Sequence, residues 1–257
     1  MTVALVTGAA RRLGRAMALY LAGRGYDVAI HYDRSATEAA DTAAEARATG
    51  VRAQVFQADL LDHEATAALV PQVAGAMGQV TVLVNNASIF EYDNIRSATM
   101  ESWDRHVGSN LRAPFQLIQS FATQAPKAAP DGNGEPVAAA LVVNMADQRV
   151  MKPTPEFMTY SLAKAGLWAL TRTAAQALAP DIRVNAIGPG PTMIGHRQTP
   201  QHFAAQRAAT ILKRGADPGD VTAALGYLLD AKAVTGQLIC VDGGQHLGWR
   251  TPDIQDS

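Results

Sequence analysis

The apolar run Val3–Val6 leads directly into Thr7-Gly8-Ala9-Ala10-Arg11-Arg12-Leu13-Gly14-Arg15. Gly8 stands where a strand would end and permits a tight turn, and Gly14 allows the following helix to approach the sheet closely. Such a turn directs the amides and the dipole of the helix N-terminus at a phosphate group. The stretch therefore predicts a strand–turn–helix unit that binds a dinucleotide, in preference to an ordinary strand–helix connection.

Outward from this turn, short apolar runs alternate with helical patterns along the whole chain. The predicted strands are Val3–Val6, Val28–Tyr32, Ala53–Phe56, Val80–Val84, Ala140–Asn144, Arg183–Ile187 and Gln237–Val241. The predicted helices lie near residues 13–23, 36–49, 63–77, 101–125, 156–179 and 218–230. This alternation is typical of α/β proteins whose parallel sheet is covered by helices on both faces. We expect one doubly wound domain over residues 1–257 with a seven-stranded sheet, and a loop over 129–136.

Composition and charge exclude several classes of protein. The 257 residues carry 22 Lys and Arg against 23 Asp and Glu, so the basic excess of a nucleic-acid binder is missing. The N-terminal residues do not resemble a signal peptide, and no apolar run is long enough to span a membrane. Cys240 is the single cysteine, and the histidines lack metal-ligand spacing. We expect a cytoplasmic protein that uses no metal ion, nucleic acid or membrane.

The residues near the expected phosphate site indicate which dinucleotide binds. Arg11 and Arg12 place two cations at the turn, and Arg34 and Ser35 follow the second strand. A guanidinium and a hydroxyl suit a ribose 2′-phosphate, which favours NADPH. Asp33 would instead favour NAD, unless the strand ends at Tyr32 and turns this carboxylate away from the ribose.

Two further segments are predicted to line the cofactor cleft. Asp59 and Leu60 follow the third strand, where a carboxylate and an apolar side chain can hold an adenine. Asn86, Ala87 and Ser88 follow the fourth strand. Because parallel strands end at the same edge of a sheet, these residues should lie beside Leu13 and the turn glycines.

Tyr160 and Lys164 carry the predicted chemistry. Their spacing of four residues in a helical pattern puts both side chains on one face. A phenol has a pKa of about 10, and a neighbouring ammonium lowers that pKa by stabilising the phenolate. The pair can therefore act as a general acid toward a carbonyl or imine that is being reduced.

In its order of motifs the chain resembles the short-chain dehydrogenase/reductase family, which has a Rossmann fold. The matching positions are Thr7 to Gly14, Asp59, Asn85-Asn86-Ala87, Asn110, Tyr160, Lys164, Ile182–Asn185, Gly188-Pro189-Gly190 and Val241–Gly244. The resemblance implies that Asn110 positions a proton-relay water and that Lys164 also binds the nicotinamide ribose. It further implies that Pro189, Gly190 and Thr192 contact the cofactor, and that the protein is a homotetramer.

One departure from the family pattern narrows the resemblance. The family usually has serine 13 residues before the tyrosine, and this chain has Asp147. The pteridine reductases have aspartate there. They also resemble this chain in Arg12, in the segment His31-Tyr32-Asp33-Arg34-Ser35 and in Asn86-Ala87-Ser88-Ile89-Phe90. The dihydromonapterin reductases, a bacterial branch, are similar to it in the closing segment Gly243-Gly244-Gln245-His246-Leu247. The resemblance implies reduction of a dihydropteridine C=N bond, with Asp147, Tyr160, Lys164 and Asn110 as catalytic residues.

A pterin is a flat, polar aromatic ring, and several side chains would suit it. Phe90 can stack on such a ring. Ser88 and Arg12 can bind its polar edge, Asp147 and Tyr160 can complete the proton relay, and Met193 can contact it. The segment over about 191–213 is expected to be a substrate lid.

Two other functions remain open from the sequence. An NADPH-dependent reductase of a 3-oxoacyl thioester or another ketone is the first alternative, although an ionised Asp147 would repel a developing oxyanion. A non-catalytic NADPH-binding sensor is the second, and the intact set of Tyr160, Lys164 and Asn110 counts against it.

Overall fold

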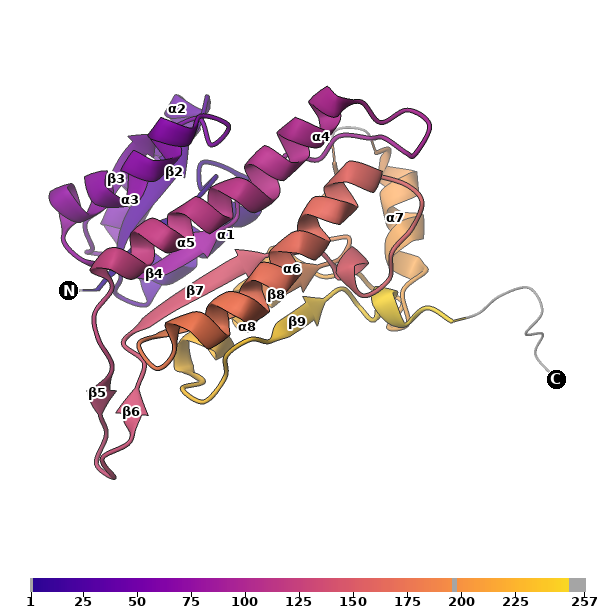
Figure 1. The fold of residues 1–257 in the computed structure, drawn as a ribbon. Coiled ribbons are helices and arrows are strands. Elements are labelled where there is room, and N and C mark those ends of the chain that lie inside the picture. The colour runs from indigo at the N-terminus through magenta and orange to yellow at the C-terminus, as the bar shows by residue number, and fades with distance from the viewer. Residues whose placement is uncertain (1, 196–197, 250–257) are drawn as a thin grey trace.

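The computed structural model describes residues 2–195 and 198–249 of the chain. Its main sheet has seven parallel strands in the order β3-β2-β1-β4-β7-β8-β9 (Figure 1). The strands are β1 (Val3–Val6), β2 (Asp27–Tyr32), β3 (Ala53–Gln57), β4 (Val80–Asn85), β7 (Ala140–Met145), β8 (Ile182–Pro189) and β9 (Leu238–Val241). The α/β, doubly wound class predicted from the sequence is confirmed.

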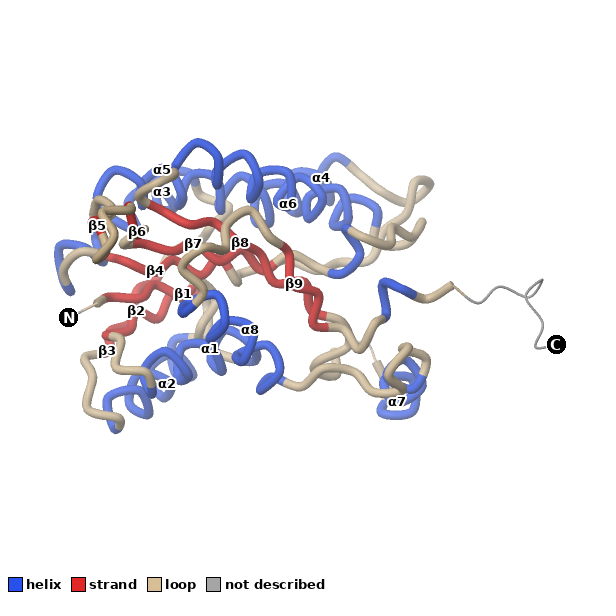
Figure 2. Tube along the Cα trace, turned by 90° about the horizontal axis from the view of Figure 1, so that it is seen from below, coloured by secondary structure: helices blue, strands red, loops and turns tan. Residues whose placement is uncertain are grey.

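Helices cover both faces of this sheet (Figure 2). One layer contains α1 (Arg12–Gly23), α2 (Ala36–Ala48) and α8 (Pro218–Asp230). The other contains α3 (His63–Met77), α5 (Ala113–Gln124) and α6 (Met158–Leu178). In the first strand, Ala4 and Val6 pack toward the first layer, and Val3 and Leu5 toward the second. Because successive residues of a strand face opposite sides, a wholly apolar run here serves two cores.

Some elements differ from the sequence predictions. The single helix expected over 101–125 consists of α4 (Met100–Val107), a π-helical turn at Gly108–Arg112, and α5. The stretch expected as a loop forms a small hairpin, β5 (Ala129–Pro130) and β6 (Pro136–Val137). Asp131 accepts the amides of Asn133 and Glu135, which closes this hairpin's turn. The helix α7 (Pro200–Ala208), capped by the Thr199 side chain, was not predicted.

The strand order reverses between β1 and β4, because β2 lies on one side of β1 and β4 on the other. In an open α/β sheet, the crevice at the carboxyl ends of two such strands is the usual ligand site. Within the described parts of the chain, no helix is long and apolar enough to cross a membrane.

Candidate active site

The turn after β1 has the geometry that its glycines predict. Gly8 has a φ of +62°, which a residue with a side chain adopts only with strain. A Cβ on Gly14 would lie 2.2 Å from the Gly8 carbonyl oxygen. The Asn86 side chain donates to the carbonyls of Thr7 and Gly8, at 2.8 and 3.2 Å. Asn86 therefore ties the end of β4 to this turn.

His31, in the neighbouring strand β2, stabilises the same turn. Its Nδ1 accepts the Gly8 amide at 3.0 Å, and its Nε2 lies 3.1 Å from the Ala58 carbonyl oxygen. Since the Gly8 amide can only donate, Nδ1 carries no proton and Nε2 donates. Burial lowers the pKa of His31 to about 4, so the ring is neutral at physiological pH.

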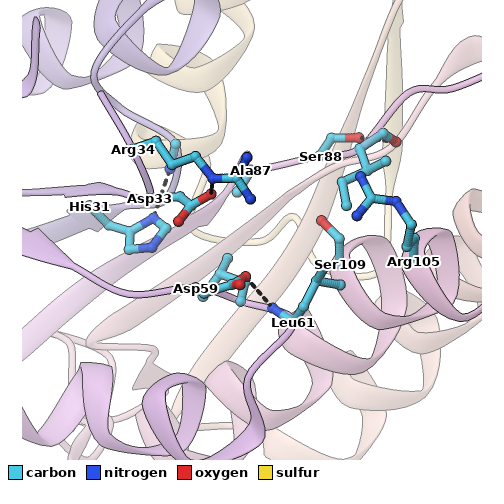
Figure 3. Close-up of a pocket in the computed structure, with 12 residues that line it drawn as sticks. His31, Asp33, Arg34, Asp59, Leu61, Ala87, Ser88, Arg105 and Ser109 are labelled. Carbon is cyan, nitrogen blue, oxygen red and sulfur yellow. Dashed lines mark hydrogen bonds and ion pairs between the residues drawn. The ribbon is translucent and has the colours of Figure 1, made fainter. Parts of the chain in front are cut away.

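A cavity of about 230 Å³ opens at the carboxyl ends of β1, β2, β3 and β4 (Figure 3). Of the residues predicted to hold a cofactor, its lining includes Gly8, Arg34, Asp59, Leu60, Ala87 and Ser88. The Arg34 side chain is 88% exposed, and its Nε lies 3.3 Å from Asp33 Oδ2. It is therefore free to turn toward an anion.

The same cavity corrects one expectation. The second strand does end at Tyr32, yet Asp33 lines the cavity beside Arg34. A residue just beyond a strand follows the turn of the chain instead of the strand's alternation. The carboxylate thus faces the cleft together with the guanidinium, and Tyr32 packs against the core beneath α1 and α2.

The other residues predicted near the turn have structural contacts. Arg11 forms an exposed ion pair with Glu38 at 3.3 Å. Leu13 packs against the core. Ser35 is the N-terminal cap residue of α2, without a capping hydrogen bond from its side chain.

Arg12 has a φ of +55°, in the left-handed region that glycine adopts freely. Left-handed backbone costs a residue with a side chain roughly 1–2 kcal/mol. The guanidinium donates to the carbonyls of Ile194 at 2.9 Å and Met193 at 3.1 Å. In contrast to the expected phosphate or pterin contact, Arg12 here holds the segment after β8.

Tyr160, Asp147 and Lys164 come together beside the crevice. The Tyr160 hydroxyl donates to Asp147 Oδ2 at 2.8 Å, and the Arg149 amide donates to Oδ1 of the same carboxylate at 2.8 Å. Lys164 Nζ donates to the Met145 carbonyl at 2.6 Å and lies 5.7 Å from the Tyr160 ring centroid. Tyr160 and Lys164 share one face of α6, as their spacing predicted.

The protonation of this group differs from the sequence expectation. Burial, followed by the charge of Asp147, raises the pKa of Tyr160 well above its usual value, so Lys164 does not lower it in this state. Burial lowers the pKa of Lys164 to about 8 and raises the pKa of Asp147. The phenol is therefore held as a protonated donor.

Phe90 forms part of an aromatic stack next to Tyr160. Its ring is 4.4 Å from that of Phe157 with an interplanar angle of 11°. It meets Tyr160 edge-on at 4.6 Å. The guanidinium of Arg149 lies 5.0 Å from the Phe157 centroid. Phe90 is still 46% exposed, so part of its surface is available to a ligand.

Asn110 is fully buried in the π-helical turn. Its Oδ1 accepts the Ile89 amide at 2.9 Å, and its Nδ2 donates to the Ile89 carbonyl at 2.8 Å. Both ends of this side chain thus hold the backbone next to Phe90. A π-turn of this kind re-aims side chains and often marks a functional site.

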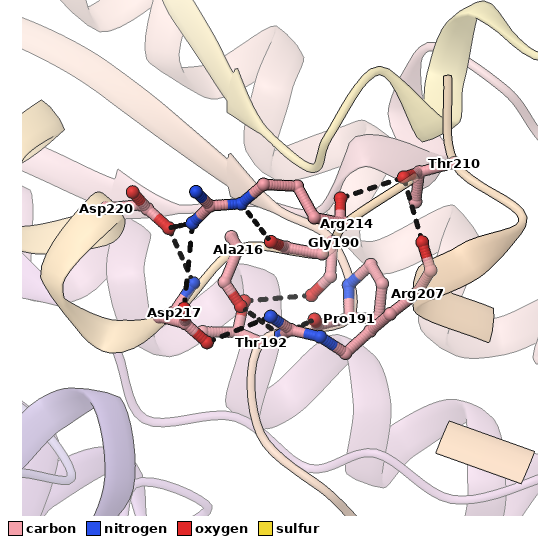
Figure 4. Close-up of polar contacts among 10 residues, drawn as sticks. Gly190, Pro191, Thr192, Arg207, Thr210, Arg214, Ala216, Asp217 and Asp220 are labelled. Carbon is pink, nitrogen blue, oxygen red and sulfur yellow. Dashed lines mark hydrogen bonds and ion pairs between the residues drawn. The ribbon is translucent and has the colours of Figure 1, made fainter. Parts of the chain in front are cut away.

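Arg207 joins the two ends of the expected lid segment, near Pro191 and near Ala216 (Figure 4). Arg207 Nη1 donates to the carbonyls of Pro191 at 3.1 Å and Ala216 at 2.6 Å, and its Nη2 donates to Asp217 at 3.1 Å. Residues 196 and 197 of this segment lie outside the described residues.

At the start of the segment, Thr192 donates to the Gly190 carbonyl at 3.0 Å. A Cβ on Gly190 would lie 2.6 Å from that of Asp242, so glycine is required for this contact. Pro189 ends β8, pairing with Val241 of β9. These residues shape the end of the crevice nearest the lid.

Several contacts at the site were missed by sequence reasoning. Phe157, Thr159, Asp93 and Arg207 were not singled out, and His106 was considered only as a metal ligand. Phe157 stands three residues before Tyr160, so its proximity could have been noticed. The others act across long sequence separations and leave no local signal.

Comparisons with known proteins agree with this architecture. Residues 8–246 match the family model described as Enoyl-(Acyl carrier protein) reductase. The chain is 32% identical over 249 residues to the 3-oxoacyl-[acyl-carrier-protein] reductase FabG of Staphylococcus epidermidis, covering 95% of this chain and 98% of that protein.

Solved structures give a second set of matches. FolM alternative dihydrofolate reductase 1 from Brucella suis, in complex with NADP, is 42% identical with a TM-score of 0.91, covering 99% of this chain and 98% of that one. A blue fluorescent protein from a metagenomic library, in complex with NADPH, is 30% identical with a TM-score of 0.83, covering 95% and 97%.

Proposed function

The chain belongs to the short-chain dehydrogenase/reductase family, and we propose that it reduces a C=N bond of a dihydropteridine with NADPH. The observation that carries the proposal is the 2.8 Å hydrogen bond from Tyr160 to Asp147. An aspartate occupies the place where the family usually has serine. A carboxylate suits the N–H donors of a pterin, and it would repel the oxyanion of a reduced ketone.

The residues of the crevice fit NADP(H). The turn at Gly8 and Gly14 leaves no room for side chains, as a close phosphate approach requires. Arg34 is an exposed cation at the cavity edge, suited to a 2′-phosphate. When bound, the cofactor supplies the hydride. Two structural neighbours are NADP or NADPH complexes, which supports the same cofactor here.

The protein's part in the reaction is a proton transfer. Tyr160 is protonated at physiological pH and donates its proton to the ring nitrogen beside the carbon that receives the hydride. The resulting phenolate lies near the Lys164 ammonium, whose charge stabilises it. Asp147 orients the phenol before the transfer through its hydrogen bond.

Phe90 provides the binding surface for the flat substrate. Its stack with Phe157 and Arg149 fixes the ring plane, so a pterin placed against the exposed part of Phe90 loses little side-chain entropy. Ser88 lies exposed nearby and can bind a polar edge of the substrate. In this proposal Met193 closes the pocket from the lid, held there by Arg12.

The alternative is NADPH-dependent reduction of a 3-oxoacyl thioester or other ketone. The 32% identity to 3-oxoacyl-[acyl-carrier-protein] reductases favours it. The 42% identity to FolM from Brucella suis favours the dihydropteridine class instead. Asp147 distinguishes the two reactions, because its negative charge suits the N–H donors of a dihydropteridine and repels the oxyanion that forms when a ketone is reduced.

Replacing Asp147 tests the proposal. We expect Asp147→Ser to lower kcat/KM for a dihydropteridine at least about tenfold and to leave that for acetoacetyl thioester unchanged or higher. Asp147→Asn, of equal size, is the matched control for charge and should lose pteridine activity as well. The proposal fails if pteridine reduction survives the serine substitution or if both substrates suffer equally.

We also propose that the protein is a cytoplasmic homotetramer. Large apolar side chains are exposed on α4, α5 and α6, which lie in one layer: Met100, Trp103, Phe115 and Leu162. Exposed apolar groups on neighbouring helices are typical of surfaces between subunits. Light scattering on the eluting peak of a size-exclusion column decides the oligomeric state: a monomer or dimer mass would contradict the tetramer.

A further inference from the structure

Phe90 and Tyr160 belong to segments far apart in sequence, yet their rings are 4.6 Å apart at an angle of 70°. One is the proposed substrate surface and the other the proposed proton donor, so their relative position determines whether the proton reaches its target. Reacting groups need alignment within a fraction of an ångström. The contacts that hold these two segments together therefore matter for catalysis.

One buried histidine contacts the neighbours of both rings. His106 has an exposed fraction of 0%. Its Nε2 accepts the amide of Glu91, the residue after Phe90, at 3.1 Å. Its Nδ1 lies 2.7 Å from the hydroxyl of Thr159, the residue before Tyr160.

The partners of His106 fix its tautomer. The Glu91 amide can only donate, so Nε2 must be unprotonated and Nδ1 must carry the proton. Nδ1 then donates to Thr159 Oγ1, and the Thr159 hydroxyl donates its own proton to Asp93. The result is one directed chain of hydrogen bonds from the Phe90 loop to the start of α6.

Asp93 completes this chain by capping α6. Its carboxylate accepts the Thr159 amide at 3.1 Å and the Ser102 hydroxyl at 3.0 Å. Its carbonyl accepts the Phe157 amide at 2.8 Å. Phe157, the residue at the helix cap position, offers no capping side chain, so Asp93 supplies the cap from another segment. A negative charge there also suits the helix dipole.

The charges around the network agree with this arrangement. Burial lowers the pKa of His106, against the opposing effect of Asp93 and Glu91, and keeps the ring neutral as its hydrogen bonds require. Burial of Asp93 acts to raise its pKa, but the hydrogen bonds from Thr159 and Ser102 outweigh it and the pKa is lowered. Asp93 therefore remains an ionised acceptor.

We propose that His106, Thr159 and Asp93 form a buried positioning network that sets Tyr160 against Phe90 for proton transfer. None of the three touches the reacting atoms, so they are positioning residues. The inference rests on the proposed function in taking Phe90 as the substrate surface and Tyr160 as the proton donor, and the second of these roles is shared by both candidate reactions.

Thr159→Val tests the network with little change in volume. It removes the hydroxyl that joins His106 to Asp93 and leaves the backbone cap in place. Because displacements of about 1 Å can cost about a hundredfold in rate, we expect kcat to fall about tenfold to a hundredfold. The Kd for NADPH, measured by fluorescence titration, should stay within about twofold, because the network is remote from the phosphate turn.

Two matched variants accompany it. Thr159→Ser keeps the hydroxyl and should restore kcat to within about threefold of the parent protein. Thr173→Val makes the same change at an exposed position of the same helix and should leave kcat unchanged. A Thr159→Val protein with parental kcat would overturn the inference, as would equal losses in kcat and NADPH binding.

The substrate used in this test is whichever one the parent protein reduces. If that is a ketone, the dihydropteridine proposal fails while the positioning test proceeds unchanged. If Thr159→Val does not fold, His106→Asn decides by the same criteria. Its amide can replace only the donor to Thr159, so kcat should fall with NADPH binding retained.

Discussion

Burial decides the protonation of two side chains at the centre of the site, Tyr160 and Lys164. Tyr160 and Lys164 are 6% and 2% exposed, and burial disfavours the charged form of each. The phenol is therefore protonated, and the ammonium deprotonates at a lower pH than usual. Tyr160 therefore carries its proton across the physiological pH range, whereas Lys164 loses its charge as the pH rises through about 8.

Tyr160→Phe removes the proposed donor while keeping the ring. General acid catalysis contributes about a hundredfold to ten-thousandfold, so kcat should fall by that range. The Kd for NADPH should change little, because the phosphate turn is untouched. Stopped-flow hydride transfer and fluorescence titration check the two parts, and a variant with more than a tenth of parental kcat would remove Tyr160 from its role.

The pKa of Lys164 sets an expected pH dependence. The lysine is charged below pH 8 and loses its charge as the pH rises through about 8, so stabilisation of the phenolate is lost on the alkaline side. Since kcat/KM for NADPH reports ionisations of the free enzyme, it should decline above about pH 8. If kcat/KM stays constant up to about pH 9.5, which is about 1.5 units above the pKa of Lys164, this assignment is contradicted.

Among the elements, the turn between β1 and α1 depends on two side chains outside it. His31 accepts the Gly8 amide from β2, and Asn86 binds the turn from the end of β4. On the other side, Arg12 holds the lid carbonyls. These hydrogen bonds fix the turn to strands β2 and β4 on one side and to the lid segment on the other.

His31 makes stability depend on pH. Its pKa is about 4 in the folded protein against 6.5 for the free side chain, so the unfolded chain binds more protons between these values. Stability is complete above pH 6.5 and decreases as the pH falls toward 4. We expect a loss of up to about 2 kcal/mol between pH 7 and pH 5 from this residue.

Urea unfolding of the parent protein and His31→Gln at both pH values measures that loss. Glutamine can donate and accept but does not titrate in this range. The difference between the two proteins should shrink on going to pH 5. An unchanged difference would show that His31 does not titrate as described.

Arg12 offers a test that separates backbone strain from side-chain contact. Arg12→Gly and Arg12→Ala both remove the bonds to Met193 and Ile194, and only glycine adopts the left-handed backbone freely. We expect the glycine variant to be more stable than the alanine variant by about 1 kcal/mol. Substrate KM should rise several-fold in both. Equal stabilities, measured by urea unfolding, would argue against strain at this position.

In the whole molecule, the parallel sheet brings the residues of the site to one edge. Residues near 8, 34, 59, 88 and 147 each follow a different strand, and all reach the same edge. The alternation of strands and helices was sufficient to predict the sheet and the turn, and the four-residue spacing was sufficient to pair Tyr160 with Lys164. The place of Asp147 beside Tyr160 was expected from the family resemblance.

Other contacts had no local signature. Arg12 and Ile194 are 182 residues apart, and only the path of the lid brings them together. Thr159 and His106 are 53 residues apart, and their bond depends on the packing of α4 against α6. Such contacts are determined by tertiary packing, which neither periodicity nor motif spacing describes.

In the proposed function, Asp147 and Phe90 adapt this family's site to a dihydropteridine. The most direct measurement is the steady-state rate of NADPH oxidation at saturating cofactor, with dihydromonapterin, dihydrobiopterin, dihydrofolate and acetoacetyl thioester compared in parallel. We expect kcat/KM for at least one dihydropteridine to exceed that for the thioester by about a hundredfold or more. Turnover of the thioester with no turnover of any dihydropteridine would contradict it.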